Sequence, residues 1–244
     1  MNKEKLNVVI PMAGAGSRFE EAGYNLPKPL IDVKGKRMIE WVIDSLCSVK
    51  LNINFIFIAQ EEHLNLGLRE YLKDKGSIIT VNSITEGAAS TVLLAKDLIN
   101  NNEELVIANC DQYLTWSFYD YITHSRLSEG SLVTFNSTNP HHSYVKLKKQ
   151  QVIEVAEKIV ISDRASAGIY YFKKGSDFIK GAQDMIDKNI RTNNEFYICP
   201  VYNELIPAKQ ISIYDINVFN KHMLGTPEEL NIFLDKIDNE EITL

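Results

Sequence analysis

The chain has 244 residues, of which 45% are hydrophobic and 24% are charged, and its formal net charge is −6 at pH 7. This composition is typical of a globular protein with a substantial core, and the negative charge argues against nucleic acid as the main partner. No apolar run is long enough for a transmembrane helix, and the start of the chain is too short for a signal peptide. We therefore expect a cytoplasmic protein that does not bind membranes.

The first predicted element is a short buried strand at residues 8–10, which are all β-branched. Small residues follow at once, and without bulky side chains their backbone amides can approach a ligand and form an anion-binding nest. These residues are Ala13, Gly14, Ala15, Gly16 and Ser17. Arg18 then adds a permanent cation, and Lys28 adds another between two prolines that restrict the backbone. The stretch therefore predicts a cradle for a polyphosphate.

Two familiar phosphate-binding loops do not fit this stretch. The dinucleotide-binding fingerprint requires a third glycine at the position of Phe19. A Walker loop requires Lys and Ser or Thr after its last glycine, whereas Ser17 and Arg18 follow Gly16. An ordinary glycine-containing turn remains the alternative for the glycines alone, and the two nearby cations favour the cradle.

Helices and strands are predicted to alternate along the next part of the chain. The helices are expected at residues 37–49, 61–74, 87–99 and 116–127, and the strands at residues 53–59, 77–81, 105–108 and 131–136. This alternation favours an α/β fold. We expect a doubly wound, mixed and mostly parallel sheet, with residues 1–244 in a single domain.

The second half of the chain is predicted to begin with a hairpin, because two short apolar runs flank the polar residues 148–151. The later elements are expected as a strand at 167–172, helices at 176–188 and 200–206, a strand at 211–219 and a final helix. The final helix should begin with Thr226 as N-cap and Pro227 at its first position.

Asp111 follows the expected strand at residues 105–108. Open α/β sheets bind their ligands outside the carboxyl ends of the strands. A carboxylate is also a hard oxygen ligand of the kind that Mg²⁺ prefers when it contacts substrate phosphates. We therefore interpret Asp111 as the ligand of a magnesium ion, with a simple turn residue as the alternative.

Several of these segments resemble the signature of the sugar-phosphate nucleotidyltransferases. The resembling segments are Ala13-Gly14-Ala15-Gly16-Ser17-Arg18, Pro27-Lys28-Pro29-Leu30 and Gly35-Lys36. The resemblance implies a Rossmann-like nucleotidyltransferase fold with a nucleotide half, about residues 1–112, and an acceptor half, about residues 113–244. It also implies a metal-dependent reaction in which a nucleoside triphosphate and a phosphorylated acceptor give a nucleotidyl acceptor and pyrophosphate.

The resemblance implies roles in nucleotide binding. Arg18, Lys28 and the amides of residues 13–17 would hold the triphosphate and the departing pyrophosphate. Asn82 followed by Gly87 has the spacing of the segment that recognises the nucleobase in this family. A plain helix start, with Thr85 as its N-cap, is compatible with the same residues.

The resemblance also implies roles in acceptor binding. Glu157-Lys158 matches a family motif, although Ile159 stands where the family has proline, and Lys158 would bind the phosphate of the acceptor. A solvated charge pair is the alternative for these two residues. Gly168 would begin the strand that lines the acceptor pocket, and Glu195 would contact the acceptor.

Met223 marks a departure from the family, which commonly has an aspartate there as a second metal ligand. A thioether is poorly suited to Mg²⁺. Asp215 and Asn217 share one face of the expected late strand and are candidate substitutes. Because Mg²⁺ can be held by one carboxylate together with substrate phosphates, we expect Asp111 to be the only essential carboxylate.

Within the family, the resemblance leans toward the cytidylyltransferases of capsule and surface-polysaccharide clusters. It implies CTP as the favoured nucleotide and a phosphorylated small molecule, with phosphoglutamine as one candidate, as the acceptor. A thymidylyl- or uridylyltransferase acting on a hexose 1-phosphate is an alternative. The Met223 departure also leaves open a degenerate nucleotide-binding regulatory subunit, and the sequence leaves assembly into a homo-oligomer open.

Overall fold

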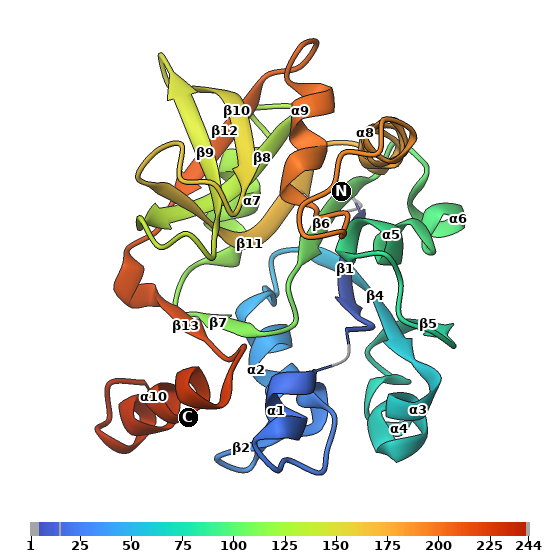
Figure 1. The fold of residues 1–244 in the computed structure, drawn as a ribbon, viewed down its shortest axis with the longest axis vertical. Coiled ribbons are helices and arrows are strands. Elements are labelled where there is room, and N and C mark those ends of the chain that lie inside the picture. The colour runs from blue at the N-terminus through green and yellow to red at the C-terminus, as the bar shows by residue number, and fades with distance from the viewer. Residues whose placement is uncertain (1–4, 15, 243–244) are drawn as a thin grey trace.

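A computed structural model of the chain describes residues 5–14 and 16–242, so the prediction made for Ala15 lies outside the described residues. A nine-stranded sheet runs through the molecule (Figure 1). Its strands are β1 (Lys5–Met12), β4 (Asn52–Gln60), β5 (Gly76–Val81), β6 (Glu104–Ala108), β8 (Gly130–Asn136), β9 (Ser143–Lys148), β10 (Gln151–Glu157), β11 (Arg164–Phe172) and β12 (Ile211–Asp215). The order is β10-β9-β11-β6-β1-β4-β5, and β8 pairs with both β11 and β12.

The centre of the sheet is built from parallel strands. β1 pairs in parallel with β4 on one side and with β6 on the other. Val8 and Ile10 pack into the core on one face of the sheet, Val9 packs into the core on the other face, and all three are fully buried. Burial on both faces explains why this strand is a continuous apolar run in the sequence. Antiparallel pairing begins at β11, which lies against β6, β8 and β9.

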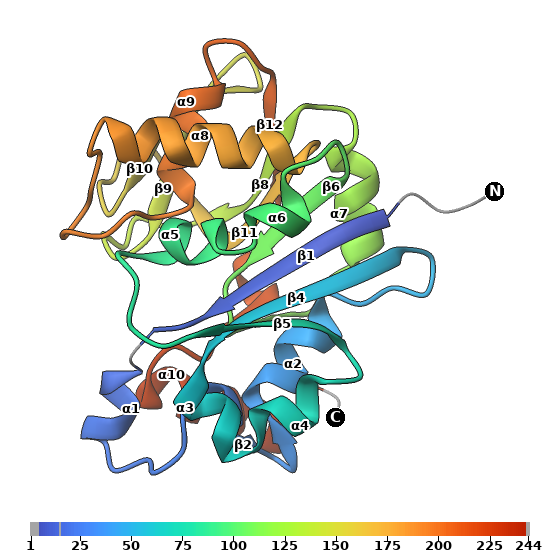
Figure 2. The ribbon, with the colours of Figure 1, turned by 90° about the vertical axis from the view of Figure 1, so that its right-hand side faces the viewer.

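Helices cover both faces of this sheet. On one side lie α2 (Met38–Ser45), α3 (Glu61–His63), α4 (Arg69–Leu72) and α7 (Phe118–Ser125); on the other lie α5 (Ala88–Leu93), α6 (Lys96–Ile99), α8 (Gly175–Asp187) and α9 (Tyr202–Leu205). Figure 2 shows α5, α6 and α8 above β1 and β4, with α2, α3 and α4 below them. The predicted doubly wound α/β fold with a mixed, mostly parallel sheet is confirmed.

A third, smaller core joins the beginning of the chain to its end. It lies between α1 (Ser17–Glu21), α2, the short hairpin of β2 (Asp32–Val33) and β3 (Lys36–Arg37), and α10 (Pro227–Asp238). Phe19, Trp41 and Phe233 are buried in it. α10 begins as predicted, because Thr226 Oγ1 accepts a hydrogen bond from the amide three residues later and Pro227 is the first helical residue.

A two-stranded antiparallel ribbon returns the end of the chain to the main sheet. It consists of β7 (Gln112–Leu114) and β13 (Lys221–Met223), with Met223 opposite Gln112. Leu224 N donates to the Asp111 carbonyl over 2.8 Å, which fixes the end of β13 beside the residue that follows β6. Neither short strand was predicted, and together they place the late part of the chain at the carboxyl end of the parallel strands.

Three predicted elements are interrupted in the structure. The helix expected at 61–74 is broken at Gly67, whose φ of 105° is not helical. The helix expected at 87–99 is divided into α5 and α6, and its N-cap is Gly87 rather than Thr85. The strand expected at 211–219 stops with β12, because the Asn217 side chain accepts from Phe219 N over 3.0 Å and caps a 3₁₀ turn.

The predicted hairpin is confirmed as β9 and β10, joined by a two-residue turn. Lys149 and Gln150 both have positive φ values, 50° and 66°, as expected for the turn type that matches the twist of two antiparallel strands. No helix within residues 5–14 and 16–242 is both long and apolar enough to cross a membrane.

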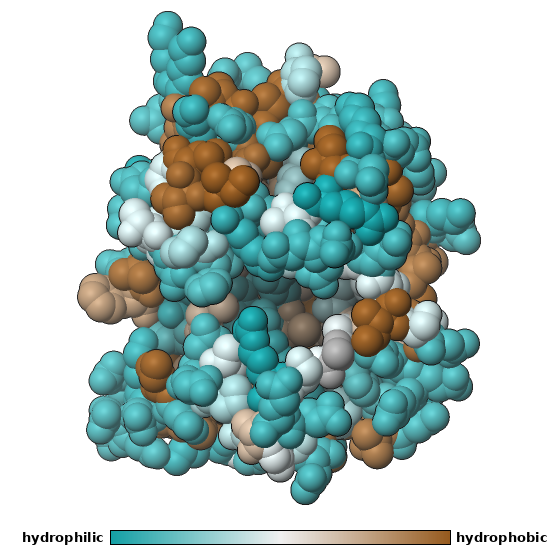
Figure 3. Space-filling view, in the orientation of Figure 1, coloured by the Kyte–Doolittle hydropathy of each residue, from teal (hydrophilic) through white to brown (hydrophobic). Residues whose placement is uncertain are grey.

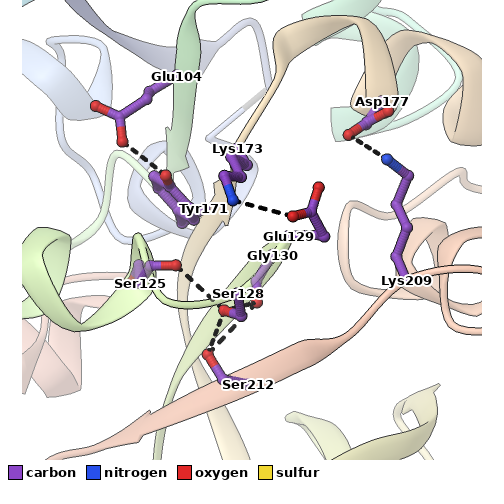
Figure 4. A network of polar contacts seen from close by, with 10 residues as sticks. All are labelled: Glu104, Ser125, Ser128, Glu129, Gly130, Tyr171, Lys173, Asp177, Lys209 and Ser212. Carbon is purple, nitrogen blue, oxygen red and sulfur yellow. Dashed lines mark hydrogen bonds and ion pairs between the residues drawn. The ribbon is translucent and has the colours of Figure 1, made fainter. Parts of the chain in front are cut away.

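A network of polar contacts holds the strands together at the amino end of β6 (Figure 4). The Glu104 carboxylate accepts from the buried hydroxyl of Tyr171 over 2.7 Å and from the Arg126 guanidinium over 2.9 and 2.6 Å. Nearby, Lys173 pairs with Glu129 at 3.0 Å. These contacts connect β6, β11 and α7 at the opposite end of β6 from Asp111.

Glu104→Ala is expected to lower the free energy of unfolding by about 2–3 kcal/mol, because it removes the acceptor of a buried hydroxyl and one half of a bidentate ion pair. Urea denaturation followed by circular dichroism measures this loss. Glu154→Ala is the control, since Glu154 pairs with Lys146 on the exposed surface at 3.2 Å and should change stability by less than about 0.5 kcal/mol. Equal losses in the two variants would show that the network does not stabilise the sheet.

Candidate active site

A hollow crosses the face of the molecule where β1 and β6 end. Figure 3 shows it in the middle of this face, bordered mainly by hydrophilic residues. It contains two cavities of about 320 Å³ and 300 Å³. Both are lined by Ala88, Asn109, Asp111 and Tyr197, so the two cavities share a wall. We call the larger the loop-side cavity and the smaller the hairpin-side cavity.

The loop-side cavity is bordered by the small-residue loop after β1. Ala13, Gly14 and Gly16 line it. Gly16 has a φ of 67° and is the N-cap of α1, a left-handed conformation that favours glycine. Gln60 Nε2 donates to the carbonyls of Ala13 and Gly14 over 2.9 and 3.2 Å, which orients this part of the loop. Ser17 begins α1 and is exposed, and the cavity lining does not include it.

Lys28 and Asp111, which are distant in the sequence, meet at the shared wall. Lys28 Nζ lies 2.8 Å from Asp111 Oδ2. Burial by itself would raise the pKa of Asp111, but the charge and hydrogen bond of Lys28, together with the charge of Lys221, outweigh it and lower the pKa. Asp111 is therefore held in its ionised form, with Lys28 as its counterion.

The Asp111 carboxylate also fits a hard cation. Its Oδ1 is buried and has no hydrogen-bond partner among the described residues, which is unusual for a buried polar atom. In the described part of the chain, no group of three or more His, Cys, Asp or Glu residues is arranged to hold a metal ion. Asp111 is the carboxylate that lines both cavities, and the Glu229 carboxylate lies on the other side of Gly225, where its Oε2 accepts from Gly225 N over 3.0 Å. A Mg²⁺ ion held by Asp111 would depend on substrate phosphates and water for its other ligands.

The candidate substitute ligands lie elsewhere and have structural partners. Asp215 accepts from Thr134 Oγ1 over 2.5 Å and pairs with Arg164 at 3.4 Å. Asn217 caps the 3₁₀ turn described above. Met223, by contrast, lines the hairpin-side cavity. The arrangement thus favours a single carboxylate at the junction of the cavities.

The structure brings Gly87 into the loop-side cavity but not Asn82. Gly87 has a φ of 123°, and a Cβ atom there would lie 2.5 Å from the Phe196 carbonyl oxygen, so only glycine fits. Asn82 is exposed and borders a neighbouring hollow beside Gln60. Thr85 lines the loop-side cavity instead, and its Oγ1 lies 2.5 Å from that of Thr91.

Lys158 lines the hairpin-side cavity, as its predicted role requires. Its Nζ donates to the Tyr197 hydroxyl over 2.5 Å, and that hydroxyl donates to the Glu195 carboxylate. Burial and the neighbouring Glu195 raise the pKa of Tyr197, which remains protonated. Glu195 itself lines the loop-side cavity, so it reaches the hairpin side only through Tyr197. The sequence analysis did not identify Tyr197.

Gly168 holds β11 against the end of β6. Its φ is 71°, and a Cβ atom there would lie 2.4 Å from Asn109 Nδ2. Asn109 N also donates to the Gly168 carbonyl over 2.9 Å. The register of β11 shifts between Ser166 and Tyr170, so Gly168 lies within an irregularity of the strand rather than at its beginning, and it lines the hairpin-side cavity. Arg18 is exposed on α1 and lines this same cavity.

Lys221 is a further cation that the sequence analysis missed. It lies in β13, is only 9% exposed and lines the hairpin-side cavity. Burial lowers its pKa to about 8, although the charges of Asp111 and Glu229 oppose this shift. The expected strand over residues 211–219 left the next segment, which forms β13, without a predicted partner. The position of Lys221 at the cavity was therefore not predicted.

The chain belongs to the nucleotidyl transferase family, because the family model matches residues 7–199. Among curated proteins, it is 26% identical over 179 residues to the mannose-1-phosphate guanylyltransferase catalytic subunit beta of Dictyostelium discoideum, covering 68% of this chain and 49% of that protein. It is 25% identical over 248 residues to the bifunctional protein GlmU of Buchnera aphidicola, covering 97% of this chain and 52% of that protein. The chain thus spans about half the length of these relatives.

Solved structures of similar fold cover nearly the whole chain. The nucleoside-diphosphate-sugar pyrophosphorylase from Vibrio cholerae RC9 has a TM-score of 0.80 and 28% identity, covering 93% of this chain and 99% of that one. The inositol-1-phosphate CTP transferase from T. maritima has a TM-score of 0.70 and 14% identity, covering 98% of each chain. The second likeness shows a shared fold.

Proposed function

We propose that this chain transfers a nucleotidyl group from a nucleoside triphosphate to a phosphorylated small molecule and releases pyrophosphate. The main support is the meeting of two cavities at Asp111, with Lys28 beside it and Lys158 in the hairpin-side cavity. The two substrates would bind on either side of the shared wall. The division into a nucleotide half and an acceptor half, near Gln112, is part of this proposal.

In this mechanism an oxygen of the acceptor phosphate attacks the α-phosphorus of the nucleotide. The new oxygen–phosphorus bond forms as the bond to the β-phosphate oxygen breaks, and pyrophosphate leaves. The second pKa of a phosphate monoester is about 6, so the attacking oxygen is largely ionised at neutral pH and no general base is required. The protein then contributes alignment and charge neutralisation.

The residues divide this work between them. The loop amides and Lys28 would hold the triphosphate. Arg18, which lines the hairpin-side cavity, would reach the phosphates across the shared wall, and the two cations would stabilise the charge that develops on the departing pyrophosphate. Asp111 would hold Mg²⁺, which neutralises phosphate charge when bound. Lys158 would fix the acceptor phosphate in line with the bond that breaks.

CTP is the nucleotide we favour, and a capsule or surface-polysaccharide precursor, with phosphoglutamine as a candidate, is the acceptor we favour. The resemblance of the sequence motifs supports both choices. The alternative is a thymidylyl- or uridylyltransferase acting on a hexose 1-phosphate. Names of the relatives that include mannose-1-phosphate favour a sugar phosphate as the general class. A cytoplasmic location is part of the proposal.

The test is a pyrophosphate-release assay with CTP, UTP, dTTP, ATP and GTP, each combined with phosphorylated sugars, polyols and amino acids. We expect release with Mg²⁺ for a small set of combinations, CTP among them, and none without a divalent ion. If no combination releases pyrophosphate above the metal-free control, the chain is a nucleotide-binding subunit rather than an enzyme.

Lys158→Ala should raise the KM for the acceptor and leave nucleotide affinity within about twofold, because Lys158 lines only the hairpin-side cavity. Loss of a charge-assisted contact should raise the activation free energy that kcat/KM reports by about 1.5–3 kcal/mol. Steady-state kinetics and calorimetry with the nucleotide measure the two effects. Lys146→Ala, on the exposed face of the same hairpin, is the control. An equal loss of nucleotide affinity in Lys158→Ala would remove Lys158 from the acceptor role.

A further inference from the structure

Lys221 is a buried lysine whose ammonium group makes no direct ion pair with another described residue, although the charges of Asp111 and Glu229 act on it from farther away. The residue is 9% exposed, and its Nζ lies over the ring of Phe135, 4.0 Å from the centroid. Among the described residues, no ion pair or hydrogen bond joins this Nζ to a carboxylate or another acceptor, and its near contact is the Phe135 ring. Lysine is almost never buried without a partner, because desolvation of an unpaired charge is costly. Burial of the Lys221 ammonium therefore costs folding free energy, and the packing of the residue does not account for its position.

Lys221 borders the hairpin-side cavity and also a smaller cavity of about 200 Å³ between β13 and α10. In β13, Lys221 and Met223 are two residues apart and share a face, and both line the hairpin-side cavity. His222, between them, lies on the other face and packs against Tyr113 and Phe233. The Phe135 ring is flanked by His142, 5.2 Å away between centroids, so the ammonium lies on a wall built from several elements.

The position of Lys221 also distinguishes the two cavities. Lys28, the cation of the loop-side cavity, is already paired with Asp111. Lys221 lines the hairpin-side cavity with Lys158 and does not line the loop-side cavity. The charge of Lys221 is thus available on the side of Asp111 where the second substrate would bind.

We propose that Lys221 binds the phosphate group of the acceptor together with Lys158, so that the hairpin-side cavity selects phosphate monoesters. This inference rests on the proposed function and adds a specificity residue to it. A monoester carries between one and a half and two negative charges at pH 7, and an ammonium has three donors for its oxygens. Because the site is partly removed from water, two cations there attract the group more strongly than surface lysines would. Acceptors without a phosphate would leave Lys221 unpaired and bind poorly.

The test compares Lys221→Met with wild type, using inorganic phosphate as the probe and calorimetry as the measurement. We expect affinity for inorganic phosphate to fall about tenfold or more in Lys221→Met and in Lys158→Met. Affinity for CTP with Mg²⁺ should stay within about twofold of wild type in both. Lys236→Met is the matched control, since Lys236 lies behind β13 against His222 and outside the hairpin-side cavity.

Thermal unfolding separates a binding role from a structural one. Methionine has nearly the length of lysine and carries no charge, so Lys221→Met should unfold at or above the wild-type midpoint; Lys221→Gln is a second neutral variant if the first does not fold. A folded neutral variant that binds inorganic phosphate within twofold of wild type would overturn the proposal. If phosphate binding depends on Lys221 but no nucleotide yields pyrophosphate, the phosphate site is supported and the proposed reaction alone is wrong.

Discussion

Asp111→Asn is expected to reduce turnover about a thousandfold or more, which corresponds to roughly 4 kcal/mol in the barrier. The substitution keeps the shape of the side chain but removes the charge that pairs with Lys28 at 2.8 Å and that would hold Mg²⁺. Among the described residues, no group of three or more His, Cys, Asp or Glu is arranged to hold a metal ion. Pyrophosphate release at saturating nucleotide, over a titration of Mg²⁺, measures the loss.

Asp215→Asn and Asn217→Ala are the controls for this prediction. Asp215 is bound to Thr134 and Arg164, and Asn217 caps a turn, so neither side chain is available to the cleft. Each variant should change kcat by less than about tenfold, or roughly 1.4 kcal/mol. A thousandfold loss in Asp215→Asn that high Mg²⁺ partly restores would place a second metal ligand on β12.

Lys28→Met should lower kcat about a hundredfold or more, with a smaller effect on nucleotide affinity. Negative charge accumulates on the departing pyrophosphate, and a cation fixed beside it stabilises the transition state more than the bound substrate. The variant also removes the counterion of Asp111, so the pKa of that carboxyl would rise, with only the charge of Lys221 and a backbone hydrogen bond left to oppose the effect of burial. Single-turnover kinetics together with nucleotide binding separate the two effects.

Lys36→Met is the control for Lys28→Met, because Lys36 pairs with Asp44 on the exposed surface at 3.1 Å and does not line the loop-side cavity. It should change kcat by less than about twofold. If Lys28→Met keeps near-normal kcat and loses only nucleotide affinity, Lys28 binds the ground state and does not assist the departure of pyrophosphate.

Local patterns predicted the first half of the fold well. The β-branched run at residues 8–10 became the central strand β1, because a parallel strand buried on both faces must be apolar throughout. Gly16 and Gly87 both have positive φ values, and both lie beside the loop-side cavity. Asp111 follows β6 at the edge of the sheet where ligands bind in such folds.

The contacts that complete the site depend on distant parts of the chain. Lys28 and Asp111 are each visible as candidates, but their ion pair requires the 3₁₀ turn after α1 to fold back onto the end of β6. Lys221 reaches the cavity because β13 pairs with β7. Both strands are too short to show the alternation of apolar and polar residues by which a strand is predicted. Tyr197 connects Lys158 to Glu195 through hydrogen bonds that sequence spacing does not indicate.

Asn82 and Gly87 lie in different hollows although their spacing predicts one shared ligand. The interval between Asn82 and Gly87 suggested that both would contact the same ligand, but the chain turns between them. Asn82 follows β5 and is exposed, whereas Thr85 and Gly87 line the loop-side cavity. Tertiary packing decides which residues of such a strand-to-helix loop face the cavity. Here the deciding contact is the close approach of Gly87 to the backbone of Phe196.

The proposed reaction transfers the α-phosphate of a nucleotide, with its nucleoside, to an acceptor at Asp111. The most direct measurement follows separately labelled α- and γ-phosphates of CTP in the presence of Mg²⁺ and a phosphorylated acceptor. We predict that the α-label appears in the product joined to the acceptor and the γ-label in pyrophosphate, and that Asp111→Asn abolishes both. A γ-label in the acceptor product or in inorganic phosphate, with the α-label left in CDP, would contradict the account.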